Sequence, residues 1–124
     1  MMLNASFPAE VHKKISDTWL TTGVAPTGDS SYRTDENGEQ YVDCTEKADN
    51  TVAGEVLKFR PRGISMDTGE ETGKFFAVVR GFLWNENLAD DDVFSIPSSG
   101  VMHSLAFKRI YRDGTDARNI FIYG

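Results

Sequence analysis

The 124-residue sequence contains one cysteine, Cys44, and two histidines, His12 and His103. A lone cysteine excludes an intrachain disulfide, and with it the disulfide frameworks of many small secreted domains, so we expect the chain to fold in a reducing cytosol. Nucleophilic catalysis by Cys44 would require a histidine at its side, and nothing in the spacing brings either histidine there. The sequence therefore predicts no catalytic residue and no enzyme.

Signals for membrane spanning and nucleotide binding are also absent from the sequence. It has no apolar run long enough to cross a bilayer, and residues 1–20 carry charges where a signal peptide needs an apolar block. The glycines follow neither of the spacings that cradle nucleotide phosphates, and Gly38 comes too early after Asp35 for a calcium-binding loop. We therefore predict no cofactor, no metal, no membrane partner and no small-molecule substrate.

Positive charge is in deficit. Thirteen Lys and Arg stand against nineteen Asp and Glu, and the formal net charge of -6 opposes non-specific nucleic-acid binding by the chain as a whole. Acidic clusters occur in predicted loops at Asp67, Glu70, Glu71 and residues 90–92. They leave open a third class of function, a small intracellular inhibitor whose acidic faces imitate nucleic-acid phosphates.

The longest apolar run is residues 74–85, which is rich in aromatic and β-branched side chains. Such side chains lose rotamer freedom in a helix but pack well on a pleated sheet. The run therefore predicts a strand that is apolar on both faces and lies in the middle of a sheet.

Residues 1–23 are predicted to form an N-terminal unit with an amphipathic helix over residues 6–20. Pro8 suits the first turn of that helix, and Gly23 suits its end. A narrow apolar stripe at four-residue spacing consists of Phe7, Val11, Ile15 and Trp19. The stripe either lies on a sheet or docks on a neighbouring subunit.

Residues 24–51 are predicted to form a polar extended arm. The stretch is crowded with Gly, Asp, Ser, Thr, Asn and Glu, and its few apolar side chains cannot offset the entropy lost on ordering it. A structureless segment of this length is uncommon inside a compact domain, so we expect another chain to order it. The residues predicted to contact other subunits are Phe7, Val11, Trp19, Tyr32 and Tyr41.

Residues 52–124 are predicted to form the β domain. Strands are expected near residues 52–60, 64–67, 74–85, 93–96, 101–112 and 119–123. The Asp-Gly-Thr-Asp sequence at residues 113–116 is typical of a hairpin turn, which predicts that the last two strands pair antiparallel. The predicted fold class is mainly β, of the α+β type, with the helix, the arm and a small antiparallel β-barrel or sandwich of about 5–7 strands in one structural domain.

The C-terminal strands carry the best candidate for nucleic-acid binding. Cations alternate there with aromatic side chains, as in β-barrel modules that bind single strands without sequence preference. The candidate residues are Lys108, Arg109, Tyr111, Arg112, Arg118 and Phe121. The same alternation occurs in half-buried strands in general, and the chain is acidic, so nucleic acid is the alternative partner and not the favoured one.

Two short segments resemble a known class of proteins. Residues 51–57, Thr-Val-Ala-Gly-Glu-Val-Leu, and residues 77–81, Ala-Val-Val-Arg-Gly, are similar to capsid decoration proteins and other small head or tail accessory proteins of tailed bacteriophages. The resemblance implies a non-catalytic virion component, made in the host cytoplasm, that works through contacts with other protein subunits. Those subunits would be further copies of the chain or capsid and tail proteins, and the predicted polar arm favours the same class.

Overall fold

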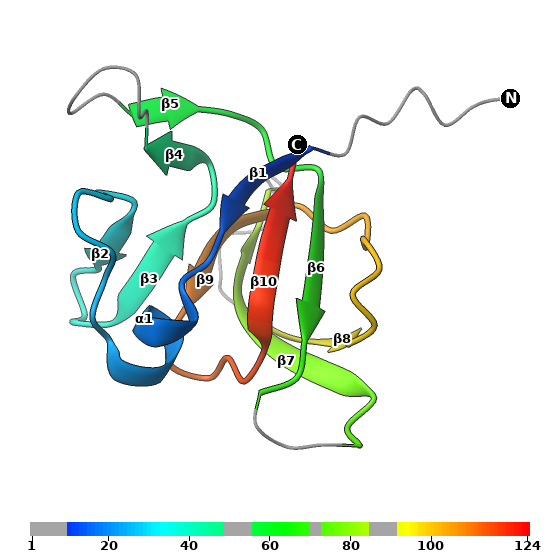
Figure 1. The fold of residues 1–124 in the computed structure, drawn as a ribbon. Helices are drawn as coiled ribbons and strands as arrows, with labels where there is room; N and C mark the ends of the chain where they lie inside the picture. The colour runs from blue at the N-terminus through cyan, green and yellow to red at the C-terminus, as the bar shows by residue number, and fades with distance from the viewer. Residues whose placement is uncertain (1–9, 49–55, 70–72, 85–91) are drawn as a thin grey trace, which may run out of the picture.

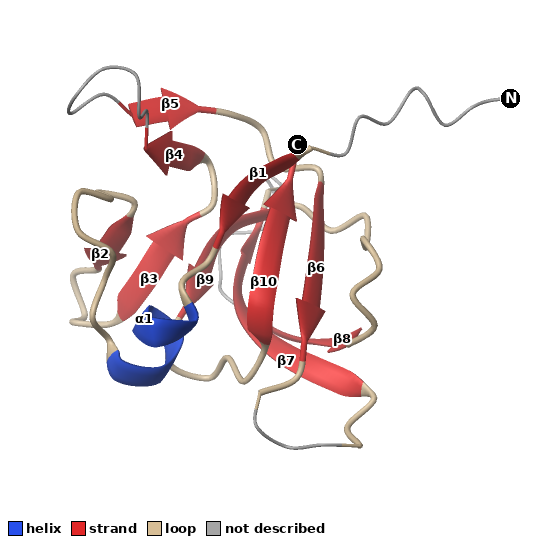
Figure 2. Cartoon of the chain, in the orientation of Figure 1, coloured by secondary structure: helices blue, strands red, loops and turns tan. Residues whose placement is uncertain are grey.

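The computed structural model describes residues 10–48, 56–69, 73–84 and 92–124 (Figure 1). In chain order its elements are β1 (Val11–Lys14), α1 (Asp17–Thr22), β2 (Tyr32–Thr34), β3 (Gln40–Asp43), β4 (Glu46–Ala48), β5 (Val56–Lys58), β6 (Gly63–Asp67), β7 (Phe76–Leu83), β8 (Asp92–Pro97), β9 (Phe107–Tyr111) and β10 (Arg118–Tyr123). The prediction of a mainly β chain is confirmed, since strands dominate and α1 is a single short helix (Figure 2).

The strands form antiparallel sheets. β1, β10 and β6, in that order, make a three-stranded sheet, and β2, β3, β9, β7 and β8 make a five-stranded sheet. β4 and β5 form a separate two-stranded hairpin that projects from the upper left of the molecule (Figure 1). Within the described residues these sheets do not close into a barrel.

The hydrophobic core lies between the two larger sheets. Buried side chains that project from the three-stranded sheet are Ile64, Met66, Ile120 and Ile122, and those from the five-stranded sheet are Val42, Ala77, Val79, Ile96, Phe107 and Ile110. Trp19 and Leu20 of α1 are buried in the same core. Because side chains alternate between the faces of a strand, the five-stranded sheet has one face on this core and a second, outer face turned away from it.

The interior strand predicted within residues 74–85 is confirmed as β7, which pairs with β8 on one side and β9 on the other. Ala77, Val79 and Gly81 are buried on the core face. Arg80 and Phe82 alternate with them and project from the outer face, where each is partly exposed. The run predicted a strand that is apolar on both faces. The outer face of β7 is instead mixed, because it carries Arg80.

The N-terminal helix predicted over residues 6–20 is wrong for residues 11–14, and only residues 17–20 of it are helical. Residues 11–14 form β1, which pairs antiparallel with β10, and residues 6–9 lie outside the described residues. The four-residue spacing of apolar side chains suggested a helix, but this segment pairs instead with one edge of β10 as the outer strand of the three-stranded sheet. Only the short stretch that follows β1 is helical.

Two caps define the helix that does form. The Ser16 hydroxyl oxygen accepts a hydrogen bond from the Trp19 amide at 3.2 Å, as an N-cap does. Gly23 ends the helix with a φ of 80°, and its amide donates to the Trp19 carbonyl at 2.8 Å. The prediction that Gly23 ends a helix is confirmed, although the helix begins much later than expected.

The polar arm predicted over residues 24–51 is also wrong for residues 32–48. Residues 32–48 contain β2, β3 and β4, and β3 pairs with β9 of the same chain. Val42 and Cys44 are fully buried in the core. The composition of the stretch, taken alone, did not reveal that a distant strand supplies its hydrogen bonds and its apolar cover.

The predicted hairpin between the last two strands does not form, because β9 and β10 belong to different sheets. The strand predicted over residues 101–112 is limited to β9. After β9 the chain continues along β7: the Thr115 hydroxyl accepts from the Arg80 amide at 3.0 Å, and the Asp116 carboxylate accepts from the Val78 amide at 2.7 Å. These side chains bind β7 and direct the chain across to the three-stranded sheet.

Candidate functional site

A cleft of about 850 Å³ opens on the outer face of the five-stranded sheet. It is lined by Thr34, Asp35, Glu36, Asn37, Glu39, Tyr41, Arg80, Phe82, Arg109 and Tyr111. Its floor comes from three adjacent strands, where Tyr41 of β3 lies opposite Tyr111 of β9 and Arg109 of β9 lies opposite Phe82 of β7. Its rim is the loop between β2 and β3.

Arg109 lies at the centre of the cleft floor. Its guanidinium carbon is 4.1 Å from the centre of the Tyr41 ring and 5.3 Å from the centre of the Phe82 ring. Its Nη1 donates to the Tyr111 hydroxyl at 3.3 Å, and within the described residues this is its one side-chain hydrogen bond. The rings hold the guanidinium in place, and most of its N–H donors are left for a ligand.

Arg80 has a different role beside it. Its guanidinium carbon lies 4.5 Å from the centre of the Tyr111 ring, and its two terminal nitrogens donate to both carboxylate oxygens of Glu39 at 3.0 and 2.7 Å. Nη1 also donates to the Asp113 carbonyl at 3.2 Å. Arg80 therefore fixes the rim loop to the sheet.

Asp35 shapes the rim loop from inside. One of its carboxylate oxygens accepts hydrogen bonds from the Glu39 and Asn37 amides, both at 2.9 Å, and the other accepts from the Tyr111 hydroxyl at 3.1 Å. The amide of Glu39, then that of Asn37, lowers the pKa of the Asp35 carboxyl. Burial raises the pKa of Tyr111, so its hydroxyl keeps the proton that it donates. Gly38 completes the turn with a φ of 83°.

The charges of the cleft are mixed. Its lining carries three carboxylates, from Asp35, Glu36 and Glu39, and two guanidiniums, from Arg80 and Arg109. Glu39 is neutralised by Arg80, whereas Glu36 is exposed on the rim. The cleft therefore presents a cation at its floor and anions around its edge.

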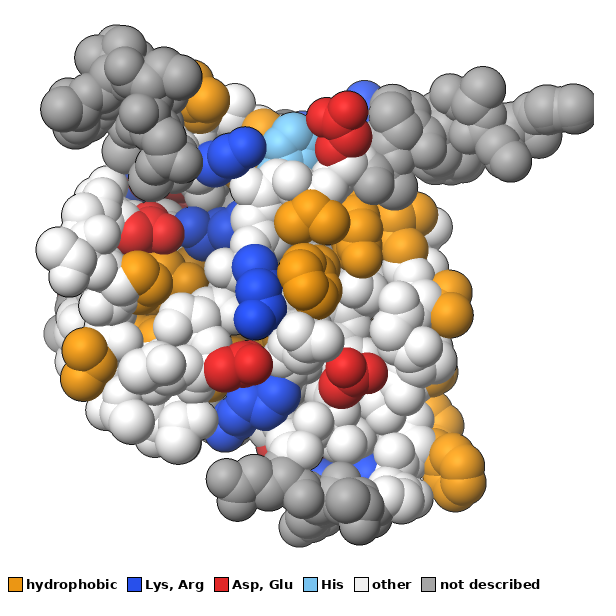
Figure 3. All heavy atoms as spheres, viewed as in Figure 1, with side chains coloured by type: hydrophobic (Ala, Val, Ile, Leu, Met, Phe, Trp, Pro, Cys, Tyr) orange, Lys and Arg blue, Asp and Glu red, His pale blue; other side chains and the backbone are white. Residues whose placement is uncertain are grey.

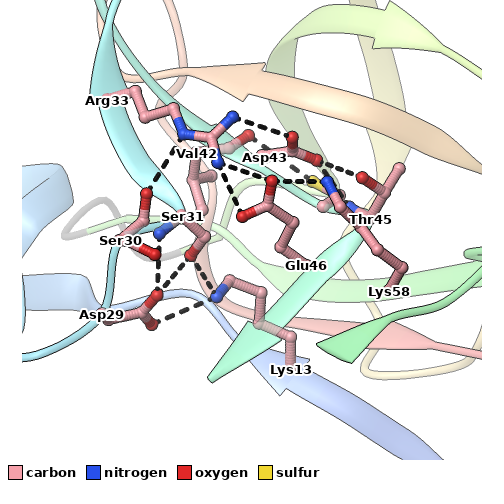
Figure 4. Close-up of polar contacts among 11 residues, drawn as sticks. Lys13, Asp29, Ser30, Ser31, Arg33, Val42, Asp43, Thr45, Glu46 and Lys58 are labelled. Carbon is pink, nitrogen blue, oxygen red and sulfur yellow. Dashed lines mark hydrogen bonds and ion pairs between the residues drawn. The ribbon is translucent and has the colours of Figure 1, made fainter. Parts of the chain in front are cut away.

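A second charged cluster, around Glu46, is built differently (Figure 4). The Glu46 side chain is 3% exposed, and both of its oxygens accept from Arg33 Nη2 at 2.5 and 2.7 Å. Lys58 Nζ adds a third contact at 2.6 Å. Arg33 also donates to the Ser30 carbonyl and to Asp43. This Glu46 cluster joins β2, β4 and β5, and its groups are occupied by one another.

A buried lysine lies next to that cluster (Figure 4). Lys13 Nζ donates to the Ser31 hydroxyl at 2.5 Å and to Asp29 at 3.2 Å. Burial alone would raise the pKa of Asp29, but hydrogen bonds from Ser31 and the Lys13 ammonium lower it below its ordinary value. Lys13 is therefore a paired structural charge that attaches β1 to the segment before β2.

Cys44 and the two histidines do not form a catalytic pair in the structure. The Cys44 side chain is fully buried, and burial raises the pKa of its thiol, so it stays protonated. His12 stacks on the Phe59 ring at 4.1 Å, and His103 Nε2 is 2.9 Å from the Pro97 carbonyl. Each histidine thus has its own structural contact.

The six residues predicted to bind nucleic acid are not assembled on one surface. Arg109 and Tyr111 lie in the cleft, but Arg112 donates to the Trp19 and Thr21 carbonyls at 2.8 and 2.9 Å and so closes the end of α1. The remaining three are divided between β9 and the three-stranded sheet: Lys108 is in β9, and Arg118 and Phe121 are in β10. On the surface over β1, α1 and β10, cations and anions are interspersed (Figure 3).

The residues predicted to contact other subunits also have separate positions. Trp19 is 1% exposed inside the core of its own chain, and the Tyr32 hydroxyl accepts from the Ser16 amide at 2.9 Å. Val11 is 48% exposed on β1, and Tyr41 lies under Arg109 in the cleft. Phe7 lies outside the described residues.

Sequence reasoning missed Arg80 and Phe82 as site residues. A signal was present, because Arg80 is the one charged residue inside the apolar run of β7. A cation on an interior strand requires either a partner or an open face, and here it has both. The high apolar content of the run predicts an interior strand and does not by itself identify Arg80 as a site residue.

No helix in the described part of the chain is both long and apolar enough to cross a membrane. The described residues also contain no group of three or more His, Cys, Asp or Glu side chains placed to hold a metal ion. Comparisons of the chain with protein-family models, with curated proteins and with solved structures found no match.

Proposed function

We propose that this protein is a non-catalytic assembly protein that docks another protein subunit on the outer face of its five-stranded sheet. The observation that carries the proposal is Arg109, a guanidinium held between two rings in an open cleft with most of its donors uncommitted. Holding such a group in place before a partner arrives lowers the entropy lost on binding. The cleft is therefore suited to recognition.

The surface beside the cleft favours a macromolecular partner. Phe76 and Val93 project from the same outer face and are 51% and 58% exposed. Val93 of β8 lies opposite the cleft residue Arg80, and Phe76 lies farther from the cleft along β7. Exposed apolar side chains next to a polar recognition group are typical of a protein interface. A small molecule held in the cleft would leave them uncovered.

The setting we propose is a virion, with the chain acting as a capsid decoration or head-tail accessory protein. The support for this setting is the sequence resemblance to small accessory proteins of tailed bacteriophages. Residues 32–48 are ordered by strands of their own chain, so they do not form an arm that another subunit orders. The outer face of the five-stranded sheet is the proposed place of contact with another subunit.

Single-stranded nucleic acid is the competing occupant, and the cleft is less suited to it. The residues Tyr41 and Tyr111 are 8% and 4% exposed, and a guanidinium already lies over the ring of each. They offer little surface on which a base could stack. The rim carboxylates also oppose a phosphate backbone.

Site-specific photo-crosslinking in the assembly made by the producing cells tests the proposal. The photoreactive residue p-benzoylphenylalanine replaces Phe76 in one variant and Val93 in another, both on the outer face. We expect both variants to attach the same protein, identified by mass spectrometry. The matched control carries the same residue at Phe121, which lies in the three-stranded sheet.

The control decides how the crosslinks are interpreted. We expect no crosslink to that protein from position 121 and a weaker one from position 76 when Arg109→Gln is added. A protein attached equally from both sheets, or nucleic acid as the sole product from positions 76 and 93, would contradict the proposed function.

A further inference from the structure

We infer that the cleft recognises a carboxylate side chain of the docked protein, with a cationic side chain next to it in the partner segment. The inference rests on the proposed function, because it specifies the chemistry of the segment that lies across Arg109. It is drawn from the unequal use of the five charged groups in the cleft lining.

Arg109 supplies the carboxylate site. A guanidinium presents a planar fork of donors that matches the two oxygens of a carboxylate. Within the described residues, the Arg109 guanidinium makes one hydrogen bond, to the Tyr111 hydroxyl at 3.3 Å. The ring contacts at 4.1 and 5.3 Å hold its plane and remove part of its hydration. Both effects strengthen a bond to an incoming anion, because less conformational freedom is lost and less water has to be removed when the bond forms.

The neighbouring charges restrict which anion fits. Glu39 is bound through both oxygens to Arg80, so this pair is not available to a ligand without breaking contacts of 2.7 and 3.0 Å. Asp35 and Glu36 remain as anions on the rim, within the same cleft as Arg109. A polyanion would face both of them, whereas a segment with one acid beside a base would pair with Arg109 and with the rim.

Nuclear magnetic resonance of the arginine Nε–Hε groups tests the inference in the whole chain. The probe is a Lys-Leu-Asp-Leu-Lys peptide with blocked ends, and its matched control has Asn in place of Asp. We expect the Asp peptide to shift the Arg109 signal and to bind about tenfold more tightly than the Asn peptide, since a charge-assisted bond is lost in the control. An oligothymidylate serves as the nucleic-acid probe.

Two variants separate charge from geometry. Arg109→Lys keeps the positive charge but loses the planar fork, and we expect it to weaken binding of the Asp peptide about tenfold. Arg62→Gln removes one positive charge from an exposed position outside the cleft lining, and we expect no change in binding. The unfolding midpoint of each variant, measured alongside, shows that the fold is retained.

Each outcome decides for or against the carboxylate site. Equal binding of the Asp and Asn peptides, or no shift of Arg109 with the Asp peptide at about 5 mM, overturns the inference. If crosslinking still identifies a protein on the outer face, the assembly function stands and only the carboxylate site is wrong. If the oligothymidylate binds more tightly than the Asp peptide, with a steep loss in salt, the inference and the protein-docking function both fail.

Discussion

Arg33 and Arg109 project from strands of the same sheet, yet their surroundings differ in kind. Arg33 donates to the Ser30 carbonyl, to Asp43 and to both oxygens of Glu46, so its donors are used within the fold. Arg109 has two rings against its faces and a single hydrogen bond to a neutral hydroxyl. The first arrangement uses the guanidinium within the fold, and the second holds a guanidinium in place while most of its donors stay without a partner in the described residues.

The two arginines show that buried polar groups of this chain have partners, whereas groups without partners lie where they can be reached from outside. A buried carboxylate such as Glu46 is costly to desolvate, and its three short contacts offset that cost. Within the described residues no buried side-chain nitrogen or oxygen lacks a hydrogen-bond partner. In the described part of the chain, uncommitted side-chain donors are therefore confined to places that solvent or a partner can reach, and those of Arg109 are among them.

The largest expected effect on stability is that of Glu46→Ala. The substitution leaves the Arg33 and Lys58 cations side by side without their anion and detaches the β4–β5 hairpin from β2. Because the two cations are 41% and 67% exposed, water partly compensates them, and we expect a loss of about 2 kcal/mol, less than for a fully buried pair. Urea unfolding measures this loss, provided that the dependence of the unfolding free energy on urea concentration is the same in the variant and the parent.

The matched control for that variant is Glu36→Ala, which removes an exposed carboxylate from the cleft rim. We expect its free energy of unfolding to stay within about 0.5 kcal/mol of the parent value. Equal losses in the two variants would show that the Glu46 cluster is no more structural than the rim.

The same substitution at the two arginines tests the comparison directly. Arg33→Gln removes the forked partner of Glu46, and we expect it to lower the free energy of unfolding by about 1.5 kcal/mol. Arg109→Gln removes the cation contacts with the rings of Tyr41, which is buried, and Phe82, which is partly exposed, and we expect a loss of about 0.5 kcal/mol. Urea unfolding of both variants side by side gives the difference. A larger loss at Arg109 than at Arg33 would mean that Arg109 is a structural residue.

Tyr111→Phe weakens the cleft without changing its stacked rings. The hydroxyl that links Arg109 to Asp35 is lost, and we expect a loss of about 1 kcal/mol with faster amide exchange at Asn37 and Glu39. Tyr123→Phe is the matched control, because the Tyr123 hydroxyl lies 2.8 Å from the Ser65 hydroxyl in the other sheet. A similar global loss with no change in loop exchange is expected there. Unchanged amide exchange at Asn37 and Glu39 in Tyr111→Phe would mean that the Tyr111 hydroxyl does not stabilise the rim loop.

The sequence predicted those features that depend on local composition. The aromatic and β-branched run predicted β7, and Gly23 predicted the end of a helix, since each follows from the residue's own conformational preference. Features set by distant pairing were missed. β1 is a strand because β10 lies beside it, and β3 is ordered because β9 supplies its partner.

The candidate site shows the same limit more sharply. Arg109 and Tyr111 were predicted as candidate binding residues because cations alternate with aromatic side chains along β9. That alternation can be found in the sequence alone. Tyr41 and Phe82, which hold Arg109 in place, come from strands far apart in the sequence. No spacing rule joins them, because β-sheet register across long connections depends on the whole fold.

The smallest expected effect is an acid-dependent loosening of the cleft rim. Hydrogen bonds from the Glu39 amide, then from the Asn37 amide and the Tyr111 hydroxyl, hold the pKa of the folded Asp35 below its ordinary value of 3.8. The unfolded chain therefore binds the proton more readily, so this stabilisation is complete above that value and is lost as the pH falls through the lower, folded pKa. A carbon-13 titration of the Asp35 carboxyl measures that pKa, and Asp35→Asn should remove the accompanying change in Glu39 amide exchange. A midpoint at or above 3.8 would mean that the folded rim does not stabilise the Asp35 carboxylate relative to the unfolded chain, and the predicted loosening of the rim in acid would then be wrong.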